Sequence, residues 1–392
     1  MLSPLVEMPV YSRWPLEIVR ASGSYLWDRA GRRYLDFYAG HAVAGSGHCH
    51  PRVVAAIREQ AEKLIFYSSA LPCEARERLL RVLGTLTPPG LTRAFFVNSG
   101  AEANEQALAL ARRRTGRSRI VGFEGAFHGR TLATLVLAGS EHYRNLARAG
   151  EAGRVLAEHV RCLPWNDPEA ARAGIDEQVA AVIVEPVQGL AGARKADGEF
   201  LRALREACDA AGAVLIFDEV QSGCLRCGGL SAGVEMGVQP DLLTLAKGIA
   251  AGLPLGAVLA TTAVCEGLSV GDLGSTFGGA PIPCAAAAAN LSALSEEGRG
   301  RRALVHGARL ARAIAGMPSV VGVDGLGLLL GVRLEVPARP VIRALLSRGV
   351  LTGTSADPHV LRLLPPLVIE EAEIELFLQT LEEVLQISGE EQ

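Results

Sequence analysis

Five short and almost uninterrupted apolar runs constrain the fold of this chain more than any other feature. Strands of a parallel sheet whose two faces are both covered have this character, because neither face meets water. Stretches of helical periodicity separate the runs, such as residues 199–211, which Gly212 follows as a C-cap. The alternation predicts an α/β fold with a mostly parallel central sheet and helices on both faces. The runs are residues 94–97, 120–123, 181–184, 214–217 and 242–246.

The two ends of the chain follow different patterns. Residues 24–37 alternate around Ala30-Gly31 and predict a hairpin, and the tail predicts helix, strand, strand and helix. A chain of 392 residues is also long for one compact domain. We therefore expect a large domain of residues 46–282, which contains the sheet, and a smaller α+β domain of residues 1–45 and 283–392.

Composition narrows the class of protein. The net charge is -3 with both signs interspersed, so neither a nucleic acid nor a membrane surface is expected as a partner. The eight cysteines are scattered, which is typical of reduced thiols in a cytoplasmic enzyme. Cys224 and Cys227 have the spacing of half a metal site, but no second pair accompanies them, and no metal is expected. No signal peptide or membrane-spanning run is visible.

Lys247 follows directly on the last apolar run. Burial at the end of a strand makes a charged lysine costly and lowers its pKa. A neutral amine can attack a carbonyl and form a Schiff base, so Lys247 is a candidate nucleophile. The alternative is that its side chain reaches along the surface to water.

Asp218 follows the run at 214–217 and is therefore expected at the carboxyl end of a buried strand, where α/β proteins bind ligands. A buried carboxylate is costly unless it meets a cation. The protonated pyridine nitrogen of pyridoxal phosphate is such a cation. A helix N-cap and a magnesium ligand are the alternative roles for this residue.

Ser99 and Glu102 have the spacing of a capping box that opens a helix directly after a strand. The small residues Gly100 and Ala101 would leave the amide groups of the first turn accessible to a phosphate. A cap with no ligand is the alternative.

Phe127 and Arg130 follow another predicted strand and flank Gly129. The aromatic ring could stack on a heteroaromatic cofactor or belong to the core. The guanidinium is suited to a carboxylate, or it is a solvated surface charge.

Six motifs occur in the order and spacing of class III pyridoxal-phosphate aminotransferases, and the chain resembles this family, in particular its acetylornithine aminotransferase branch. The likeness runs from about residue 15 to residue 385, and the segment around Arg362 resembles the C-terminal arginine motif of that branch. It implies the type I fold of pyridoxal-phosphate-dependent transferases. The motifs are Ser99-Gly100-Ala101, Phe127-His128-Gly129-Arg130, Glu185-Pro186-Val187-Gln188-Gly189, Asp218-Glu219-Val220-Gln221, Leu245-Ala246-Lys247-Gly248 and Gly274-Ser275-Thr276-Phe277-Gly278-Gly279.

The resemblance implies a role for each matching residue. Lys247 would hold pyridoxal 5′-phosphate covalently and shuttle a proton during catalysis, and Asp218 would pair with the pyridinium nitrogen. The other expected cofactor contacts are Gln221 at the phenolic oxygen, Phe127 and Val220 on the two ring faces, and Ser99, Gly100 and Ala101 at the phosphate, assisted by Thr276 of the partner subunit. Arg130, Ser275 and Arg362 would bind the carboxylate or polar groups of the substrate.

The implied reaction moves the ω-amino group of N-acetylornithine, or a similar acylated diamino acid, to 2-oxoglutarate in a homodimer with shared active sites. Related donors remain open, namely succinylornithine, carrier-protein-bound aminoadipate semialdehyde, ornithine and 4-aminobutyrate. An aminomutase of the glutamate-1-semialdehyde type is an alternative of another class.

Three departures from the branch bear on the substrate. Leu225-Arg226-Cys227-Gly228 stands where the branch usually has Gly-Arg-x-Gly, Gly278-Gly279-Ala280-Pro281 stands where it has Gly-Gly-Asn-Pro, and the third departure follows the Glu-Pro motif. Members of the branch usually carry a second glutamate five residues after that of the Glu-Pro motif, and this glutamate is thought to gate the C-terminal arginine. Here the position is Leu190. Arg362 is therefore expected either to stay available to a carboxylate or to find another partner.

Overall fold

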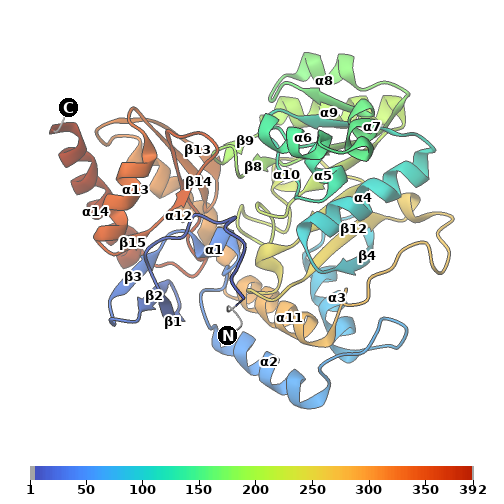
Figure 1. Cartoon of the computed structure of the whole chain (residues 1–392). Helices are drawn as coiled ribbons and strands as arrows, with labels where there is room; N and C mark the ends of the chain where they lie inside the picture. The colour runs from blue at the N-terminus through green and yellow to red at the C-terminus, as the bar shows by residue number, and fades with distance from the viewer. Residues whose placement is uncertain (1–4, 391–392) are drawn as a thin grey trace.

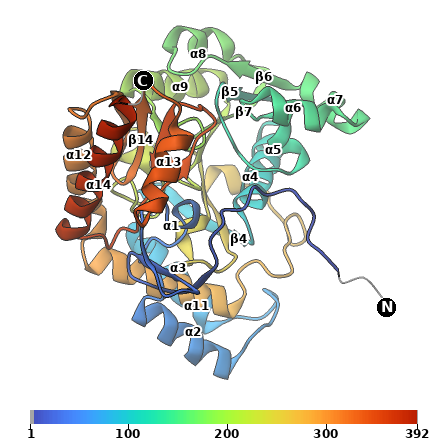
Figure 2. The same ribbon diagram turned by 60° about the vertical axis from the view of Figure 1, so that its left-hand side comes forward.

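The largest layer of the computed structural model, which describes the backbone of residues 5–390 and the side chains of residues 5–387, is a seven-stranded sheet (Figures 1 and 2). Strand β12 is antiparallel to both of its neighbours, and the remaining pairs are parallel. The mostly parallel sheet is therefore confirmed. In spatial order the strands are β4 (Leu91–Val97), β12 (Gly256–Thr261), β11 (Leu242–Leu245), β10 (Val214–Asp218), β7 (Val179–Val184), β5 (Arg119–Phe123) and β6 (Val160–Leu163).

The five predicted strands correspond to β4, β5, β7, β10 and β11, whereas β6 and β12 were not predicted. Strand β6 has the sequence Val-Arg-Cys-Leu and lies at the edge of the sheet, where its outer side needs no continuous apolar run. Strand β12 begins at Gly256, the last of three glycines after Lys247, and this spacing is more typical of a loop.

Helices cover both faces of this sheet, as predicted. Successive residues of β10 point to opposite sides, so Ile216 packs with residues of α4 (Gly100–Thr115) and Phe217 packs with residues of α9 (Gly198–Ala211). Gly212 ends α9 in a left-handed conformation with φ 65°, which confirms the predicted C-cap. The other helices of this region are α5 (Leu132–Val136), α6 (Glu141–Arg148), α7 (Glu151–Glu158), α8 (Pro168–Gly174), α10 (Ala232–Glu235) and the 3₁₀ turns η1 (Lys247–Ile249) and η2 (Ala263–Cys265).

The N-terminal segment pairs with the C-terminal part of the chain. The predicted hairpin is present as β2 (Tyr25–Asp28) and β3 (Arg33–Asp36), and β3 pairs in parallel with β15 (Val350–Leu351). The predicted boundaries of the two domains stay a prediction. The remaining strands are β1 (Ile18–Ser22), the sheet of β13 (Val320–Leu326), β14 (Leu329–Leu334), β17 (Val360–Leu363) and β16 (Gly353–Thr354), and the pair β8 (Val187–Gln188) and β9 (Arg194–Lys195).

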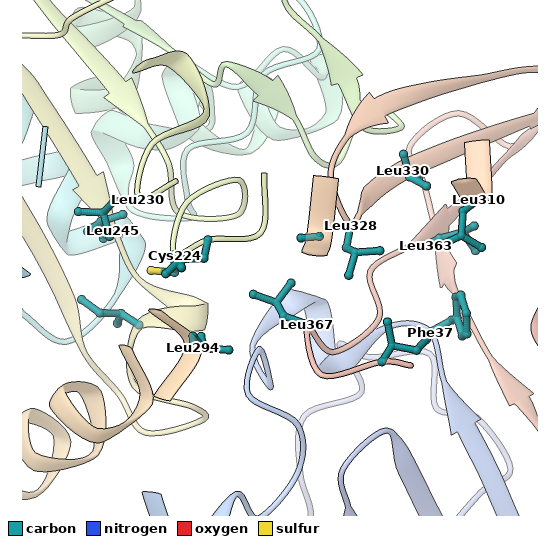
Figure 3. Close-up of a cluster of buried hydrophobic side chains, with 14 of the residues drawn as sticks. Phe37, Cys224, Leu230, Leu245, Leu294, Leu310, Leu328, Leu330, Leu363 and Leu367 are labelled. Atoms are coloured by element: carbon teal, nitrogen blue, oxygen red, sulfur yellow. The ribbon is translucent and has the colours of Figure 1, made fainter. Parts of the chain in front are cut away.

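One buried apolar cluster joins the sheet to both ends of the chain. Figure 3 shows Leu245 of β11, Phe37 after β3 and Leu363 of β17 in this cluster. Phe37 stacks on Phe377 with ring centroids 3.9 Å apart, and both rings are fully buried. The helices at this junction are α3 (Glu74–Leu86), α11 (Pro281–Glu296), α12 (Arg299–Ile314), α13 (Ala338–Ser347) and α14 (Glu371–Glu390).

Two segments near the N-terminus differ from ordinary packed helices, one in its backbone geometry and the other in how little of it is buried. The turn α1 (Ala39–Ala42) has non-helical geometry, and α2 (Pro51–Lys63) begins with proline at its first position. Within α2 only Val53 is fully buried, and Leu64 just beyond it is 41% exposed. None of the helices within residues 5–390 combines the length and apolar character needed to cross a bilayer.

We predict that Phe377→Ala destabilises the protein by about 3–5 kcal/mol, because it removes a buried ring that packs on Phe37 and leaves a cavity. Leu376→Ala is the matched control, since Leu376 is 42% exposed on the same helix and its loss is expected to cost no more than about 0.5 kcal/mol. Urea unfolding of the two variants measures the difference. Equal losses in both would contradict this account of the junction.

Candidate active site

A cavity of about 680 Å³ lies where several strands of the large sheet reach their carboxyl ends. Residues of the segments that follow β4, β5, β7, β10 and β11 line it, because these strands run in the same direction and end at the same edge. Of the predicted site residues, those that line it are Ser99, Gly100, Ala101, Phe127, Arg130, Asp218, Val220, Gln221, Lys247 and Arg362. Ser275 and Thr276 are not among the lining residues.

Lys247 lies in this cavity at the first position of η1, separated from the end of β11 by Ala246. Its φ of 43° is unusual for a residue other than glycine. Burial lowers the pKa of its amine, the charges of Asp218 and Glu185 oppose this effect, and Arg362 adds to it. The predicted direction of the shift is therefore confirmed, and a larger fraction of the amine is neutral than in an exposed lysine.

Asp218 is the last residue of β10 and is only 3% exposed. Its Oδ2 atom lies 2.7 Å from both Asn104 Nδ2 and His128 Nδ1, and Oδ1 accepts from Val220 N–H at 3.0 Å. Asn104 is itself held by Thr244, which donates to it at 2.7 Å. The sequence predicted that a cofactor cation would lie beside this carboxylate. The structure shows a buried histidine, His128, beside it.

His128 completes the buried pair with Asp218. Burial opposes protonation of the imidazole, but the hydrogen bond and charge of Asp218 outweigh this and raise the pKa of His128. Its Nε2 atom is buried and has no hydrogen-bond partner among the described residues. His128 belongs to a motif quoted above, yet nothing in its sequence position indicated contact with Asp218.

The start of α4 forms the part of the wall that is suited to an anion. Ser99 caps the helix by accepting from Glu102 N–H at 3.2 Å. The capping box is only half correct, because the Glu102 carboxylate accepts from Asn98 N–H at 3.0 Å instead of from the N–H of the cap. The first amide groups of the helix, at Gly100 and Ala101, have no intrahelical acceptor.

Gly100 allows this helix start to approach the Asp218 loop. A Cβ atom at Gly100 would lie 2.7 Å from Val220 Cγ1, so a larger residue would push the two segments apart. The absence of a side chain at Gly100 therefore lets the start of α4 lie close to Val220, two residues after Asp218.

Phe127 and Arg130 share one neighbour, Tyr143. The Phe127 ring lies 5.5 Å from the Tyr143 ring, and Arg130 Nη2 donates to the Tyr143 hydroxyl at 3.3 Å. The backbone N–H of Phe127 donates to Glu185 Oε1 at 2.8 Å. The ring and the guanidinium are thus positioned in the cavity wall by contacts from two separate segments.

Glu185 was part of a quoted motif but was assigned no role. It follows β7 and is buried, and its second oxygen accepts from Gly189 N–H at 3.2 Å. Burial and the charge of Asp218 raise the pKa of Glu185 to about 7. Its position at a strand end is the same signal that identified Asp218, so this residue could have been found from the sequence.

Arg362 of β17 is only 3% exposed, and all of its hydrogen-bond acceptors are neutral. Burial lowers the pKa of its guanidinium. Leu190 lines the same cavity, and no carboxylate of the described residues bonds to Arg362. The acceptors are the carbonyls of Thr354 and Gly189, the Gln221 side-chain oxygen at 3.4 Å and the Tyr38 hydroxyl at 3.3 Å.

The turn α1 carries further polar side chains to the cavity. Its residues have φ values between 46° and 70°, a left-handed region that costs roughly 1–2 kcal/mol for each residue other than glycine. Asp36 holds the turn by accepting from the N–H groups of Tyr38 and Ala39, each at 2.8 Å. Tyr38 and His41 both line the cavity, and no sequence pattern pointed to either.

Ser275 and Thr276 lie outside the cavity. The Ser275 hydroxyl accepts from Asn98 Nδ2 at 3.2 Å, which places it next to the start of α4. Thr276 is exposed. Their roles remain predictions.

The cavity fits pyridoxal phosphate in three independent respects. Lys247 supplies an amine whose pKa is lowered, the start of α4 offers amide donors for a phosphate, and Asp218 offers a buried acceptor for a ring nitrogen. Phe127 and Val220 also line the cavity and are available to contact a ring.

The family model for Aminotransferase class-III matches residues 8–385 of this chain. Acetylornithine aminotransferase of Methanopyrus kandleri is 43% identical over 387 residues, which are 98% of this chain and 97% of that protein. The [LysW]-aminoadipate semialdehyde transaminase of Deinococcus radiodurans is 40% identical over 379 residues, with 96% and 87% covered.

A solved structure of ornithine aminotransferase from Toxoplasma gondii, with partial occupancy of PLP at its active site, is also similar. It has a TM-score of 0.91 and 30% identity and covers 98% of this chain and 92% of that one. Each of these comparisons spans nearly the whole sequence, and together they confirm the predicted fold and cofactor. The chain belongs to the class III aminotransferases, which depend on pyridoxal 5′-phosphate.

Proposed function

We propose that this chain transfers the ω-amino group of N-acetylornithine, or a similar acylated diamino acid, to 2-oxoglutarate, giving the semialdehyde and glutamate. The observation that carries the proposal is a single cavity lined by Lys247, Asp218 and the two arginines Arg130 and Arg362. The names of its relatives support the donor, since several are acetylornithine aminotransferases.

The residues that would hold the cofactor follow from their places in the cavity wall. The amides of Gly100 and Ala101 would bind the phosphate, Phe127 and Val220 would contact the ring, and Gln221 would bond the phenolic oxygen. When bound, pyridoxal phosphate supplies an electron sink next to the reacting amine.

Lys247 moves the proton at the substrate carbon, because its amine is neutral in a larger fraction and lies inside the cavity. Asp218 holds a proton at the ring nitrogen. Asn104 and His128 fix the orientation of this carboxylate through two bonds of 2.7 Å to one oxygen. Arg130 and Arg362 supply two cations for the two carboxylates of 2-oxoglutarate.

A second donor is favoured by one relative. The Deinococcus radiodurans protein is named for the semialdehyde of aminoadipate on a carrier protein, so a carrier-bound donor is the next candidate. A panel of donors assayed with 2-oxoglutarate separates the two. An aminomutase would release no glutamate from 2-oxoglutarate in any of these assays.

We also propose that the active enzyme is a cytoplasmic homodimer in which Ser275 and Thr276 act at a shared active site. The cytoplasmic location is supported by the eight cysteines, all of which are free. Next to Thr276, Phe277 is 61% exposed, and its ring lies 5.2 Å from that of Phe66. Exposed apolar side chains gathered in this way favour a protein interface, and the others nearby are Leu64, Ile65, Tyr67 and Leu71.

We predict that Lys247→Ala abolishes turnover and leaves the fold intact, because the variant lacks the amine that moves the proton. Glutamate formation from N-acetylornithine and 2-oxoglutarate is the measurement, with circular dichroism as the check on folding. Lys63→Ala, an exposed lysine of α2, is the control and is expected to keep full activity. Repeated turnover by Lys247→Ala would refute the assigned role.

We predict that Leu190→Glu makes the enzyme discriminate more strongly between ω-amino and α-amino donors. A carboxylate at this position would pair with Arg362, whose present acceptors are all neutral, and would compete with substrate carboxylates. Leu190→Gln has the same length without the charge and serves as the control. Unchanged relative rates of the two donor classes in Leu190→Glu would show that this account is wrong.

We predict that Phe277→Asp weakens the dimer, because it places a charge in the exposed apolar group described above. Sedimentation velocity should give twice the chain mass of 41.2 kDa for the unmodified protein and a monomer fraction for the variant. Val270→Asp, at an exposed residue of the same loop, controls for added charge. A monomeric parent protein with full activity would exclude the shared site.

A further inference from the structure

The turn α1 presents His41 at a position that the mechanism above does not use. Its backbone lies in an unfavourable left-handed region over four successive residues. Such geometry persists only where the surroundings enforce it, and Asp36 does so here with two hydrogen bonds and a third contact, to His48 Nε2 at 2.8 Å. The strain is therefore maintained at the one turn that brings His41 to the cavity.

A short chain of hydrogen bonds orients the imidazole. Arg362 Nη2 donates to the Tyr38 hydroxyl at 3.3 Å, and this hydroxyl lies 2.6 Å from His41 Nδ1. Because the phenol accepts from the arginine, its own proton is free to go to Nδ1. With Nδ1 as the acceptor of this bond, the proton of the neutral ring is on Nε2.

The surroundings of His41 lower the pKa of its imidazole. Partial burial has the largest effect, and the positive charges of Arg362, Lys247 and Arg130 lower the pKa further, while part of the side chain stays accessible from the cavity. Within residues 5–390 no group bonds to Nε2. Its N–H is thus the donor that His41 can offer to a ligand in the cavity.

We propose that His41 determines donor specificity by donating its Nε2–H to the amide carbonyl of an acylated amino donor. This inference rests on the proposed function, because it requires that an acylated diamino acid enters the cavity. No other residue has been assigned to bind the acyl group of such a donor, and His41 would supply this contact.

A neutral amide suits this position better than a carboxylate does. Arg130 and Arg362 already provide cations for carboxylates, and a charged arginine is a stronger partner for them than a neutral imidazole. An amide carbonyl accepts one hydrogen bond from a neutral donor without any change of charge.

His41→Phe tests the proposal by keeping a flat ring and removing both nitrogens. We expect kcat/KM for N-acetylornithine to fall about fivefold to tenfold, the size of one neutral hydrogen bond, while the KM for 2-oxoglutarate stays the same. His41→Gln should recover most of the loss, because its amide nitrogen can take the place of Nε2. Melting temperature and cofactor absorbance establish that each variant is folded and loaded.

Three outcomes would overturn the proposal: no effect of His41→Phe on N-acetylornithine, an equal loss for both substrates, or a failure of His41→Gln to recover activity. An equal loss would place His41 at a carboxylate instead. Tyr38→Phe should give a smaller loss with the same preference for the acylated donor, because the ring stays but loses its orienting bond. If the unmodified enzyme makes no glutamate from N-acetylornithine, the proposed function itself fails.

Discussion

A carboxylate buried at the end of β10 is the constraint on which the rest of the site depends. Burying the Asp218 carboxylate costs free energy, and hydrogen bonds from Asn104 of α4 and His128 of the loop after β5 offset this cost. Each of these elements is held in turn by the sheet, and Thr244 of β11 fixes Asn104. Three strands and a helix thus position one oxygen atom of the carboxylate that is proposed to pair with the ring nitrogen of the cofactor.

The other wall of the cavity comes from segments that lie far from the sheet in sequence. Arg362 belongs to β17, and Tyr38 and His41 follow the N-terminal hairpin. The apolar cluster that contains Phe37 and Phe377 holds these segments against the sheet (Figure 3). The position of the arginine that is proposed to bind substrate therefore depends on the packing between the two ends of the chain.

Leu190, which stands in place of the glutamate usual in the branch, changes the electrostatics of this wall. Arg362 is buried among carbonyls, an amide and a phenol, so its charge is solvated but not neutralised. In the family branch a glutamate is thought to pair with this arginine, whereas here no carboxylate of the described residues forms a hydrogen bond with it, and a ligand carboxylate is proposed to do so. The Tyr38 hydroxyl also links the arginine to His41, and both of these residues line the cavity.

The sequence by itself determined the parallel sheet and the edge where the site lies. Apolar runs such as 214–217 are continuous, and each delivers its next polar residue, Asp218 or Lys247, to the same edge. Edge strand β6 escaped detection because it needs no such run, and β12 escaped detection because the glycines that lead into it are more typical of a loop. Only the tertiary structure decided that His128 pairs with Asp218, that Glu102 turns to Asn98, and that the left-handed turn brings His41 beside Arg362 through Tyr38. The bonds of His128 to Asp218 and of Arg362 to Tyr38 join residues 90 and 324 positions apart, so they depend on how the elements pack and not on any local pattern. The bonds of Glu102 to Asn98 and of Tyr38 to His41 are local, but their geometry depends on the backbone conformation that the surrounding elements impose.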